Sequence, residues 1–138
     1  MNIFVVSYRG YGNSTGTPTE VGLMSDARAT LEYVFNKLKI DTSKVFIFGR
    51  SLGGAVTIYS ATLEYPVRGI ILENTFTCIG DMVSAIMPKL AWLKFLVLRI
   101  DWPSEKRMAS VKCPILMISG GQDELVPPRH MERLREAA

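Results

Sequence analysis

The feature that most constrains the fold is a G-x-S-x-G pattern at residues 49–53, with Ser51 at its centre. The pattern follows an apolar, β-branched run at residues 45–48 and precedes a segment of helical composition. It therefore predicts a sharp turn from a buried strand into a helix. A serine at such a turn is a candidate nucleophile, and the alternative is a glycine-rich turn whose serine has no chemical role.

The spacing of this pattern has a steric explanation. A serine in a strained backbone conformation needs small neighbours, which Gly49 and Gly53 provide, and Gly54 lets the helix approach the sheet. Ser51 would then lie above the sheet edge at the positive end of the helix. The backbone N–H of Leu52 is a candidate donor for an oxyanion hole.

The order of the remaining elements predicts an α/β fold. The predicted strands cover residues 3–7, 45–48, 67–72 and 115–118. Helical segments separate them, which favours a parallel sheet flanked by helices. The strand runs are apolar without alternation, so both faces of the sheet are expected to be covered. Four strands are few for an open sheet, and we interpret residues 1–138 as one partial domain.

Capping signals set the predicted ends of the helices. Thr17-Pro18-Thr19-Glu20 fits a capping box, with Thr17 as the cap and Pro18 at the first helical position. The helix that it opens would bury one apolar face, made of Met24, Ala27, Leu31, Val34 and Leu38. A second helix is expected from Leu52 to Glu64, and a last one begins at Pro127-Pro128.

An aspartate follows the fourth predicted strand, within the loop of residues 119–128. In parallel sheets functional groups gather at the carboxyl ends of strands, where both Ser51 and Asp123 are expected. Asp123 is therefore the candidate catalytic acid, which would orient a histidine and stabilise its cation. The alternative is an aspartate that only caps the loop. Glu124 is the nearest rival and is expected to face solvent.

A serine nucleophile needs a general base, and the chain contains one histidine, His130. It lies seven residues after Asp123, in the first turn of the last predicted helix. The base is expected after a further strand, so we favour His130 as a surface or helix-start residue. The other interpretation, in which the loop brings His130 to Asp123 as the base, stays open.

Composition and charge exclude several classes of protein. Hydrophobic residues make up 48% and charged residues 21%, as in a globular domain. The net charge is +3 and the basic residues are dispersed, so we expect no nucleic-acid partner. Cys78 and Cys113 lack zinc spacing and are expected to be reduced thiols. We expect no cofactor, no metal, no leader peptide and no membrane-spanning segment.

Residues 76–111, between the third and fourth predicted strands, form a candidate cap or lid. The segment is helical in composition and rich in Met, Trp and Leu, and residues 89–112 carry six basic and two acidic side chains. An apolar, basic cap is suited to peripheral contact with an anionic membrane or to an acyl chain. The alternative, which we favour, is ordinary packing of the cap on the sheet.

Four stretches give the chain a family resemblance. They are residues 8–12 (Tyr-Arg-Gly-Tyr-Gly), 48–55 around Ser51, 73–76 (Glu-Asn-Thr-Phe) and 118–128 around Asp123. With these the chain resembles the α/β-hydrolase-domain-containing protein 13 group, the Bem-type hydrolases, over nearly its whole length. Ser7 stands where many hydrolases have aspartate.

The resemblance implies a serine hydrolase with Ser51 as nucleophile and Asp123 as triad acid. It implies hydrolysis of an ester, a thioester or an amide, with a small molecule or an acylated protein as substrate, and protein depalmitoylases are among the neighbouring groups. Relatives have an N-terminal membrane anchor, a His-Gly oxyanion loop and a catalytic histidine after the last strand, and we expect all three to lie outside this chain. The rival hypothesis is an inactive, truncated remnant or an interaction module.

Overall fold

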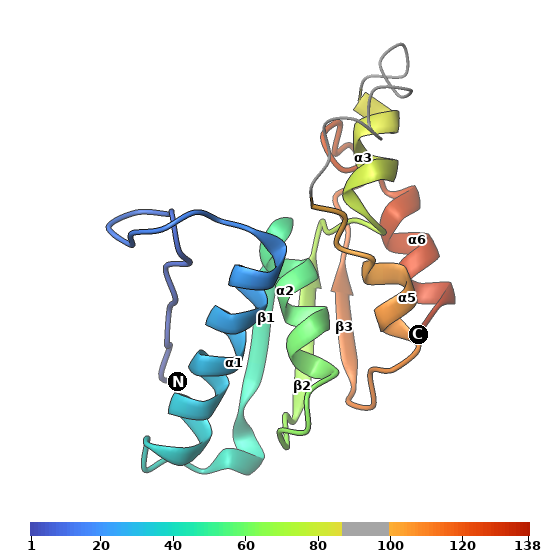
Figure 1. Ribbon diagram of the computed structural model, residues 1–138. Coiled ribbons are helices and arrows are strands. Elements are labelled where there is room, and N and C mark those ends of the chain that lie inside the picture. The colour runs from blue at the N-terminus through green and yellow to red at the C-terminus, as the bar shows by residue number, and fades with distance from the viewer. Residues whose placement is uncertain (87–99) are drawn as a thin grey trace.

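The computed structural model describes residues 1–86 and 100–138 and has a parallel sheet at its centre (Figure 1). Three strands pair in the order β1-β2-β3. They are β1 Phe46–Arg50, β2 Gly69–Glu73 and β3 Ile115–Ile118. Ile71 of β2 pairs with Phe48 and with Leu116, so the three carboxyl ends meet at one edge of the sheet. The predicted parallel arrangement is confirmed.

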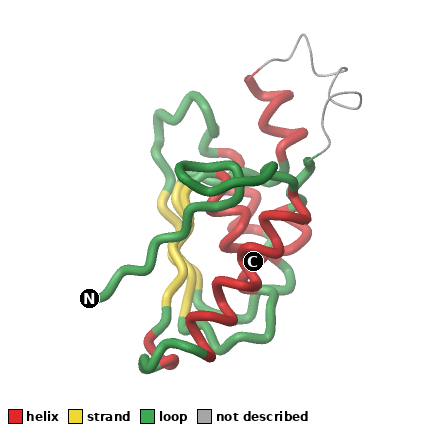
Figure 2. Tube along the Cα trace, turned by 60° about the vertical axis from the view of Figure 1, so that its left-hand side comes forward, coloured by secondary structure: helices red, strands yellow, loops and turns green. Residues whose placement is uncertain are grey.

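Helices cover one side of this sheet (Figure 2). They are α1 Glu20–Asn36, α2 Leu52–Ala61, α3 Ile79–Ile86, α5 Ser104–Met108 and α6 Arg129–Glu136, and a short 3-10 helix, Thr42–Lys44, precedes β1. α2 packs directly on β1 and β2, and α1 and α5 pack against α2. This arrangement confirms the predicted α/β class.

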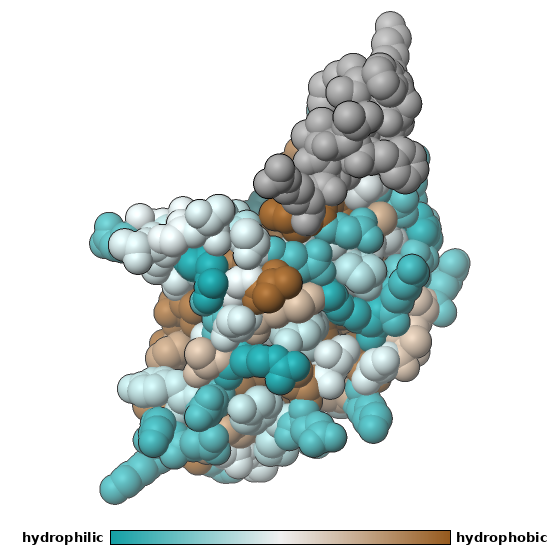
Figure 3. Space-filling view, in the orientation of Figure 1, coloured by the Kyte–Doolittle hydropathy of each residue, from teal (hydrophilic) through white to brown (hydrophobic). Residues whose placement is uncertain are grey.

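The other face of the sheet is apolar and exposed. Phe46, Phe48, Leu116 and Ile118 are between 45% and 60% exposed. The prediction that both faces are covered is therefore wrong for the described part of the chain. Strands without alternation indicate only that both faces are apolar, not that both are covered. The face seen in Figure 3 is mainly polar, with smaller apolar areas.

The predicted first strand, at residues 3–7, is also absent from the sheet. Ile3, Phe4 and Val5 are exposed, and the N-terminal segment runs apart from the edge of β1 (Figure 1). A strand exists only through hydrogen bonds to a neighbour, and this segment has none within reach. Phe4 instead contacts Tyr33 of α1, with ring centroids 5.9 Å apart.

The N-terminus of α1 differs from the predicted capping box by two residues. Thr19, not Thr17, is the cap, and its Oγ1 accepts from the N–H of Gly22 at 3.1 Å. Of the predicted apolar face, Ala27, Leu31 and Val34 are buried. Met24 is only partly buried, Leu38 lies beyond the end of α1, and Leu23 takes the buried position in the first turns. α2 ends at Ala61 rather than Glu64, and α6 begins at Arg129, one residue after the two prolines.

The predicted cap, residues 76–111, lies between β2 and β3 and contains α3 and α5. Residues 87–99, which hold most of its predicted apolar and basic surface, lie outside the described residues, and the predicted membrane contact falls largely on them. Among the residues that the structure describes, no helix is both long and apolar enough to cross a membrane.

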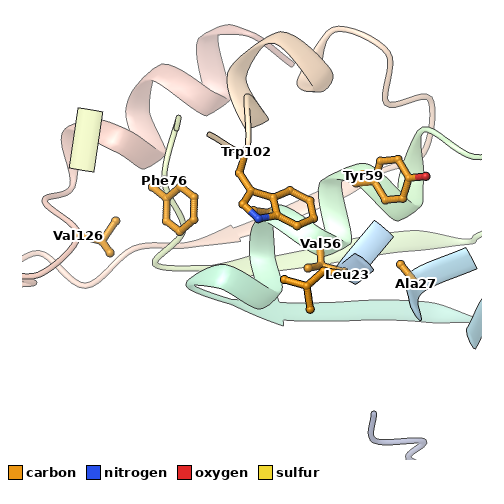
Figure 4. Packing of buried hydrophobic residues seen from close by; sticks show 8 residues of the cluster. Leu23, Ala27, Val56, Tyr59, Phe76, Trp102 and Val126 are labelled. Carbon is orange, nitrogen blue, oxygen red and sulfur yellow. The ribbon is translucent and has the colours of Figure 1, made fainter. Parts of the chain in front are cut away.

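The main core lies between α1, α2 and the parts of the cap that carry Phe76 and Trp102 (Figure 4). Figure 4 shows Phe76 and Trp102 side by side above α2, with Leu23 and Ala27 reaching in from α1. Trp102 and Phe76 are fully buried, although Trp102 has a left-handed backbone with φ 47°. The core therefore joins the end of the cap to the helix that follows Ser51.

Glu20, the first residue of α1, anchors the segment that returns from the cap. Its Oε2 accepts from the N–H groups of Asp101 and Trp102, both at 3.1 Å, and its Oε1 accepts from Arg107 at 3.0 Å. The Arg107 guanidinium also lies 5.2 Å from the Trp102 ring and 5.5 Å from the Tyr59 ring. One carboxylate thus ties the first turn of α1 to the start of α5.

We expect Glu20→Gln to lower the free energy of unfolding at neutral pH by about 1 to 2 kcal/mol, since charge-assisted hydrogen bonds contribute on that scale. Burial alone would raise the pKa of Glu20, but hydrogen bonds from Trp102, Arg107 and Asp101 hold this pKa below its ordinary value. The stabilisation is therefore present at neutral pH and is lost as the pH falls through the lowered pKa.

Urea unfolding over a pH series measures this effect. The difference between the wild type and Glu20→Gln should shrink in acid, where Glu20 is protonated. Glu32→Gln, on the exposed side of the same helix, is the matched control and should change little. A difference that stays constant down to low pH would contradict the ion-pair explanation.

Candidate active site

Ser51 lies at the junction of β1 and α2 in a conformation that side chains rarely adopt. Its backbone has φ 52° and ψ −119°. Backbone strain of this kind costs about 1–3 kcal/mol and persists only where the surroundings enforce it. Here the Ser51 N–H donates to the carbonyl of Glu73 at 3.0 Å, and the Thr75 hydroxyl donates to the carbonyl of Ser51 at 2.7 Å. The structure therefore contains the sharp turn that the sequence predicted.

Glycines make room for this turn, but not all of them in the predicted way. A Cβ at Gly49 would lie 2.1 Å from the carbonyl oxygen of Gly53, and a Cβ at Gly54 would lie 2.4 Å from Cβ of Thr75. Both contacts confirm the predicted need for glycine. A Cβ at Gly53 would meet only the Tyr8 hydroxyl, at 3.9 Å. The space around Gly53 therefore does not require a glycine. Its part in the turn is its carbonyl group, which lies where a Cβ at Gly49 would be.

Leu52 is the first residue of α2 and is partly buried against the main core. An N–H in the first turn of a helix has no intrahelical acceptor. The N–H of Leu52 is therefore free of the helix ladder, as an oxyanion donor must be. Its role in catalysis stays a prediction.

Asp123 lies in the loop after β3, half-buried, while Glu124 is exposed, as expected. Oδ1 of Asp123 accepts from the N–H groups of Leu125 and Val126, both at 2.9 Å. Its Oδ2 accepts from Nδ2 of Asn74 at 2.7 Å. Asp123 thus caps its own loop and is also held from β2. The capping alternative and the functional interpretation are compatible in this geometry.

The exit of β2 connects the serine turn to the aspartate loop. Ser51 follows β1, Asp123 follows β3, and β2 lies between the two strands. Glu73 and Thr75 bind the backbone of Ser51, and Asn74 binds the side chain of Asp123. The structure therefore gathers both predicted site residues at the carboxyl edge of the sheet. Neither of them forms a direct hydrogen bond to the other.

His130 is the second residue of α6, so it lies in the first turn of the last helix as predicted. It is 2% exposed, so the alternative of a surface residue is wrong. Its Nδ1 lies 3.0 Å from the hydroxyl of Thr77. That hydroxyl donates to Asp81 at 3.0 Å, and the backbone N–H of Thr77 donates to Nδ1 at 3.4 Å. A backbone N–H only donates, so Nδ1 is the acceptor and the proton of the neutral ring lies on Nε2. Nε2 is buried and has no hydrogen-bond partner among the described residues.

Burial is the main reason why the pKa of His130 lies below its ordinary value, and the nearby Arg129 cation lowers it further. Asp81 and Glu105 oppose this shift. His130 forms no hydrogen bond to Asp123. The partners of Asp123 are the side chain of Asn74 and the backbone N–H groups of Leu125 and Val126. The open interpretation in which the loop brings His130 to Asp123 is not supported by these contacts.

Sequence reasoning gave no role to Asn74, Thr75 or Thr77. All three lie in or beside the Glu-Asn-Thr-Phe stretch at residues 73–76, which carried the family resemblance. Asn74 has φ 42°, a left-handed conformation that asparagine adopts more readily than most residues. An asparagine directly after a buried strand was thus the available signal.

Side chains that could bind a metal ion do not cluster in the part of the chain that the structure describes. Among residues 1–86 and 100–138, no group of three or more His, Cys, Asp and Glu side chains is placed to bind a metal ion. An open polar cleft of about 650 Å³ lies beside Arg9 and Asp26, and neither Ser51 nor Asp123 lines it.

A parallel sheet with a serine at a strained strand-to-helix turn defines the α/β-hydrolase class of fold. Residues 1–104 match the family model described as serine aminopeptidase, S33. The chain therefore belongs to this family of hydrolases.

Two relatives are similar over almost the whole chain. The alpha/beta hydrolase domain-containing protein WAV2 of Arabidopsis thaliana is 44% identical and covers 96% of this chain and 47% of its own length. Protein bem46 of Schizosaccharomyces pombe is 40% identical and covers 95% of this chain and 44% of its own length. The predicted resemblance to the Bem-type group is confirmed, and the chain spans less than half the length of these relatives.

A solved structure shows the same fold at low identity. Acetyl xylan esterase 1 from Thermoanaerobacterium is similar with a TM-score of 0.70 at 20% identity, over 94% of this chain and 54% of the esterase chain. This likeness confirms the predicted architecture.

We expect Gly49→Ala to destabilise the protein by at least about 1–3 kcal/mol, because its Cβ would overlap the backbone of Gly53 and force α2 away from β1. Gly53→Ala is the matched control. It adds the same methyl group where 3.9 Å is available, and it should leave the free energy of unfolding unchanged or raise it by up to about 1 kcal/mol. Urea unfolding of both variants measures the difference, and equal effects would contradict the close approach.

His130 is the one histidine of the chain, so its ring protons can be followed by NMR without assignment. We expect it to titrate below the ordinary histidine pKa of about 6.5, because the folded state disfavours its cation. The unfolded chain then takes up a proton first, and the free energy of unfolding falls as the pH drops below that value. A titration at or above the ordinary value would contradict the burial of His130.

Proposed function

We propose that this chain carries the nucleophile and the acid of a serine hydrolase that cleaves acyl bonds. The observation that supports this most is the strained backbone of Ser51, held between a buried strand and a helix N-terminus. The family is a hydrolase family. A strained serine at this point of the fold has no evident structural purpose, because a glycine would adopt the same turn without cost.

In the proposed mechanism the Ser51 hydroxyl attacks the substrate carbonyl while a histidine takes its proton. Asp123 orients that histidine and stabilises the imidazolium that forms. The N–H of Leu52 donates to the developing oxyanion, and the N-terminus of α2 adds a favourable potential. Hydrolysis of the acyl-enzyme by water, with the histidine as base, then regenerates Ser51.

The proposed base is a histidine outside this chain, in the rest of the full-length protein. His130 is unsuited because its Nδ1 faces Thr77 and accepts from the Thr77 N–H, whereas a triad histidine directs Nδ1–H to the triad acid. Reduced basicity from burial adds to this. Relatives are more than twice as long as the part that this chain matches, which leaves room for such a residue.

The proposed substrates are esters, thioesters or amides with an acyl group. The family description names an aminopeptidase and the structural neighbour is an esterase, so both amide and ester cleavage occur on related folds. Partly buried apolar side chains, including Met24, Met82 and Ile100, pack against the same core as Leu52. They provide an apolar environment near the serine turn that suits an acyl chain, including that of an acylated protein.

The second candidate function is that of an inactive remnant or interaction module. The burial of His130 and its bonds to Thr77 favour it, because the one histidine of the chain is then engaged elsewhere. In a triad, loss of the base can reduce turnover by about six orders of magnitude. This chain alone would then bind without turning over.

A fluorophosphonate probe distinguishes the two. We expect the full-length protein to be labelled at Ser51, and Ser51→Ala to abolish labelling, because the probe reacts with an activated serine. Asp123→Asn should slow labelling by about 10⁴-fold, as loss of a correctly oriented histidine does in serine proteases. Labelling rates read by mass spectrometry give both values.

Ser110→Ala, in an exposed turn, is the control and should label like the wild type. The 138-residue chain, tested in parallel, should label far more slowly than the full-length protein. A full-length protein that is folded but not labelled at Ser51 would overturn the hydrolase proposal in favour of the interaction module.

A further inference from the structure

We propose that Asn74 is the positioning residue for the catalytic carboxylate. It holds Asp123 so that Oδ2 is the oxygen that faces the triad base, and it fixes the place of Asp123 relative to Ser51. This inference rests on the proposed function and assigns to the same site a residue that contacts neither substrate nor nucleophile oxygen.

The two oxygens of Asp123 have different partners. Oδ1 accepts two backbone N–H groups, from Leu125 and Val126, which use both of its lone pairs. From the described residues Oδ2 accepts one hydrogen bond, from Nδ2 of Asn74 at 2.7 Å, and keeps one lone pair. The oxygen that remains available to a histidine is therefore the one that Asn74 holds.

The orientation of the Asn74 amide follows from its other partner. Its Oδ1 accepts from the N–H of Gly120 at 2.7 Å. A backbone N–H only donates, so the amide oxygen must face Gly120 and the NH₂ group must face Asp123. One side chain therefore binds both the backbone of the aspartate loop, at Gly120, and the carboxylate of Asp123 itself.

The backbone of Asn74 joins this loop to the serine turn. Its N–H donates to the carbonyl of Ile118 at 3.1 Å, and its φ of 42° turns the chain away from β2. The residues on either side, Glu73 and Thr75, bind the N–H and the carbonyl of Ser51. Three consecutive residues thus set the position of the nucleophile and of the acid together.

Such positioning is needed because triad geometry tolerates little error. Misplacement of a catalytic group by about 1 Å can cost roughly 100-fold in rate. Without Asn74, the loop keeps the backbone bonds to Oδ1, but Oδ2 and the N–H of Gly120 lose their partner. Asp123 would then be free to rotate its usable oxygen away from the base.

Two substitutions separate the amide from the backbone. Asn74→Gly keeps the left-handed conformation at no steric cost and removes only the side chain. In the full-length protein we expect it to lower kcat for an ester substrate by about 10- to 100-fold with KM little changed. Asn74→Asp keeps the shape and the acceptor for Gly120 but places a second carboxylate 2.7 Å from Oδ2 of Asp123.

The pH profile is the readout that a purely structural role would not change. Once both carboxylates are ionised, the pair carries one negative charge more than Asp123 alone, and that charge favours protonation of the base. We therefore expect the acid limb of kcat/KM for Asn74→Asp to move to higher pH by about one pH unit or more. Asn36→Asp makes the same charge change at the exposed end of α1 and should leave the limb unmoved.

Gly120 offers an independent test that leaves Asn74 intact. A Cβ at Gly120 would lie 3.2 Å from Nδ2 of Asn74, so Gly120→Ala should displace the amide and lower kcat. A Cβ at Gly121 meets nothing within 4 Å, so Gly121→Ala is the matched control. Equal kcat values for the two variants would count against the proposal.

Amide hydrogen exchange tests the positioning without any turnover. In Asn74→Gly we expect exchange at Gly120, which loses its acceptor, to rise by about tenfold or more, while the core of β1 and β2 stays protected. Unchanged exchange at Gly120, or an unchanged acid limb in Asn74→Asp, would overturn the role of Asn74. If Asn74→Gly shows this rise but the wild type is not labelled at Ser51, the proposed function is overturned instead and Asn74 is a structural residue.

Discussion

The hydrogen bonds between Ser51 and the end of β2 are the interaction on which the site depends. The turn at Ser51 is unfavourable by itself, and local sequence cannot hold it. Glu73 accepts from its N–H and Thr75 donates to its carbonyl, so both sides of the strained residue are fixed by the neighbouring strand. These bonds require Arg50 to pair with Glu73. The register of β1 on β2 therefore determines the geometry of the candidate nucleophile.

Sequence reasoning succeeded where a feature depends on neighbouring residues. The serine turn, the parallel order and the place of Asp123 follow from local patterns and from the rule that parallel strands end at one edge. It failed where a feature depends on distant partners. Residues 3–7 have the composition of a strand, but no strand lies beside them to pair. Phe46 and Leu116 are apolar enough to be buried, yet they are exposed.

Two polar residues show the same limit. Glu20 fits a capping box by spacing, but its carboxylate binds the N–H groups of Asp101 and Trp102, more than 80 positions away. Thr19 takes over as the cap. His130 begins a helix that looks exposed in sequence, but Thr77 covers its imidazole. A sequence pattern cannot reveal which distant backbone group a carboxylate or an imidazole will find.

The geometry of the candidate site and its turnover are two properties that can be considered separately. Ser51 adopts its strained turn, and Asp123 its hydrogen bonds, through contacts within residues 49–126, without a hydrogen bond from either of them to His130. The geometry of the candidate nucleophile and acid is therefore a consequence of how β1, α2, β2 and β3 pack. In the proposed function turnover needs a further group, but the fold keeps Ser51 in its strained conformation by contacts that do not involve that group. The form of the candidate site thus follows from folding, and the proposed activity is a separate property that the labelling rate measures.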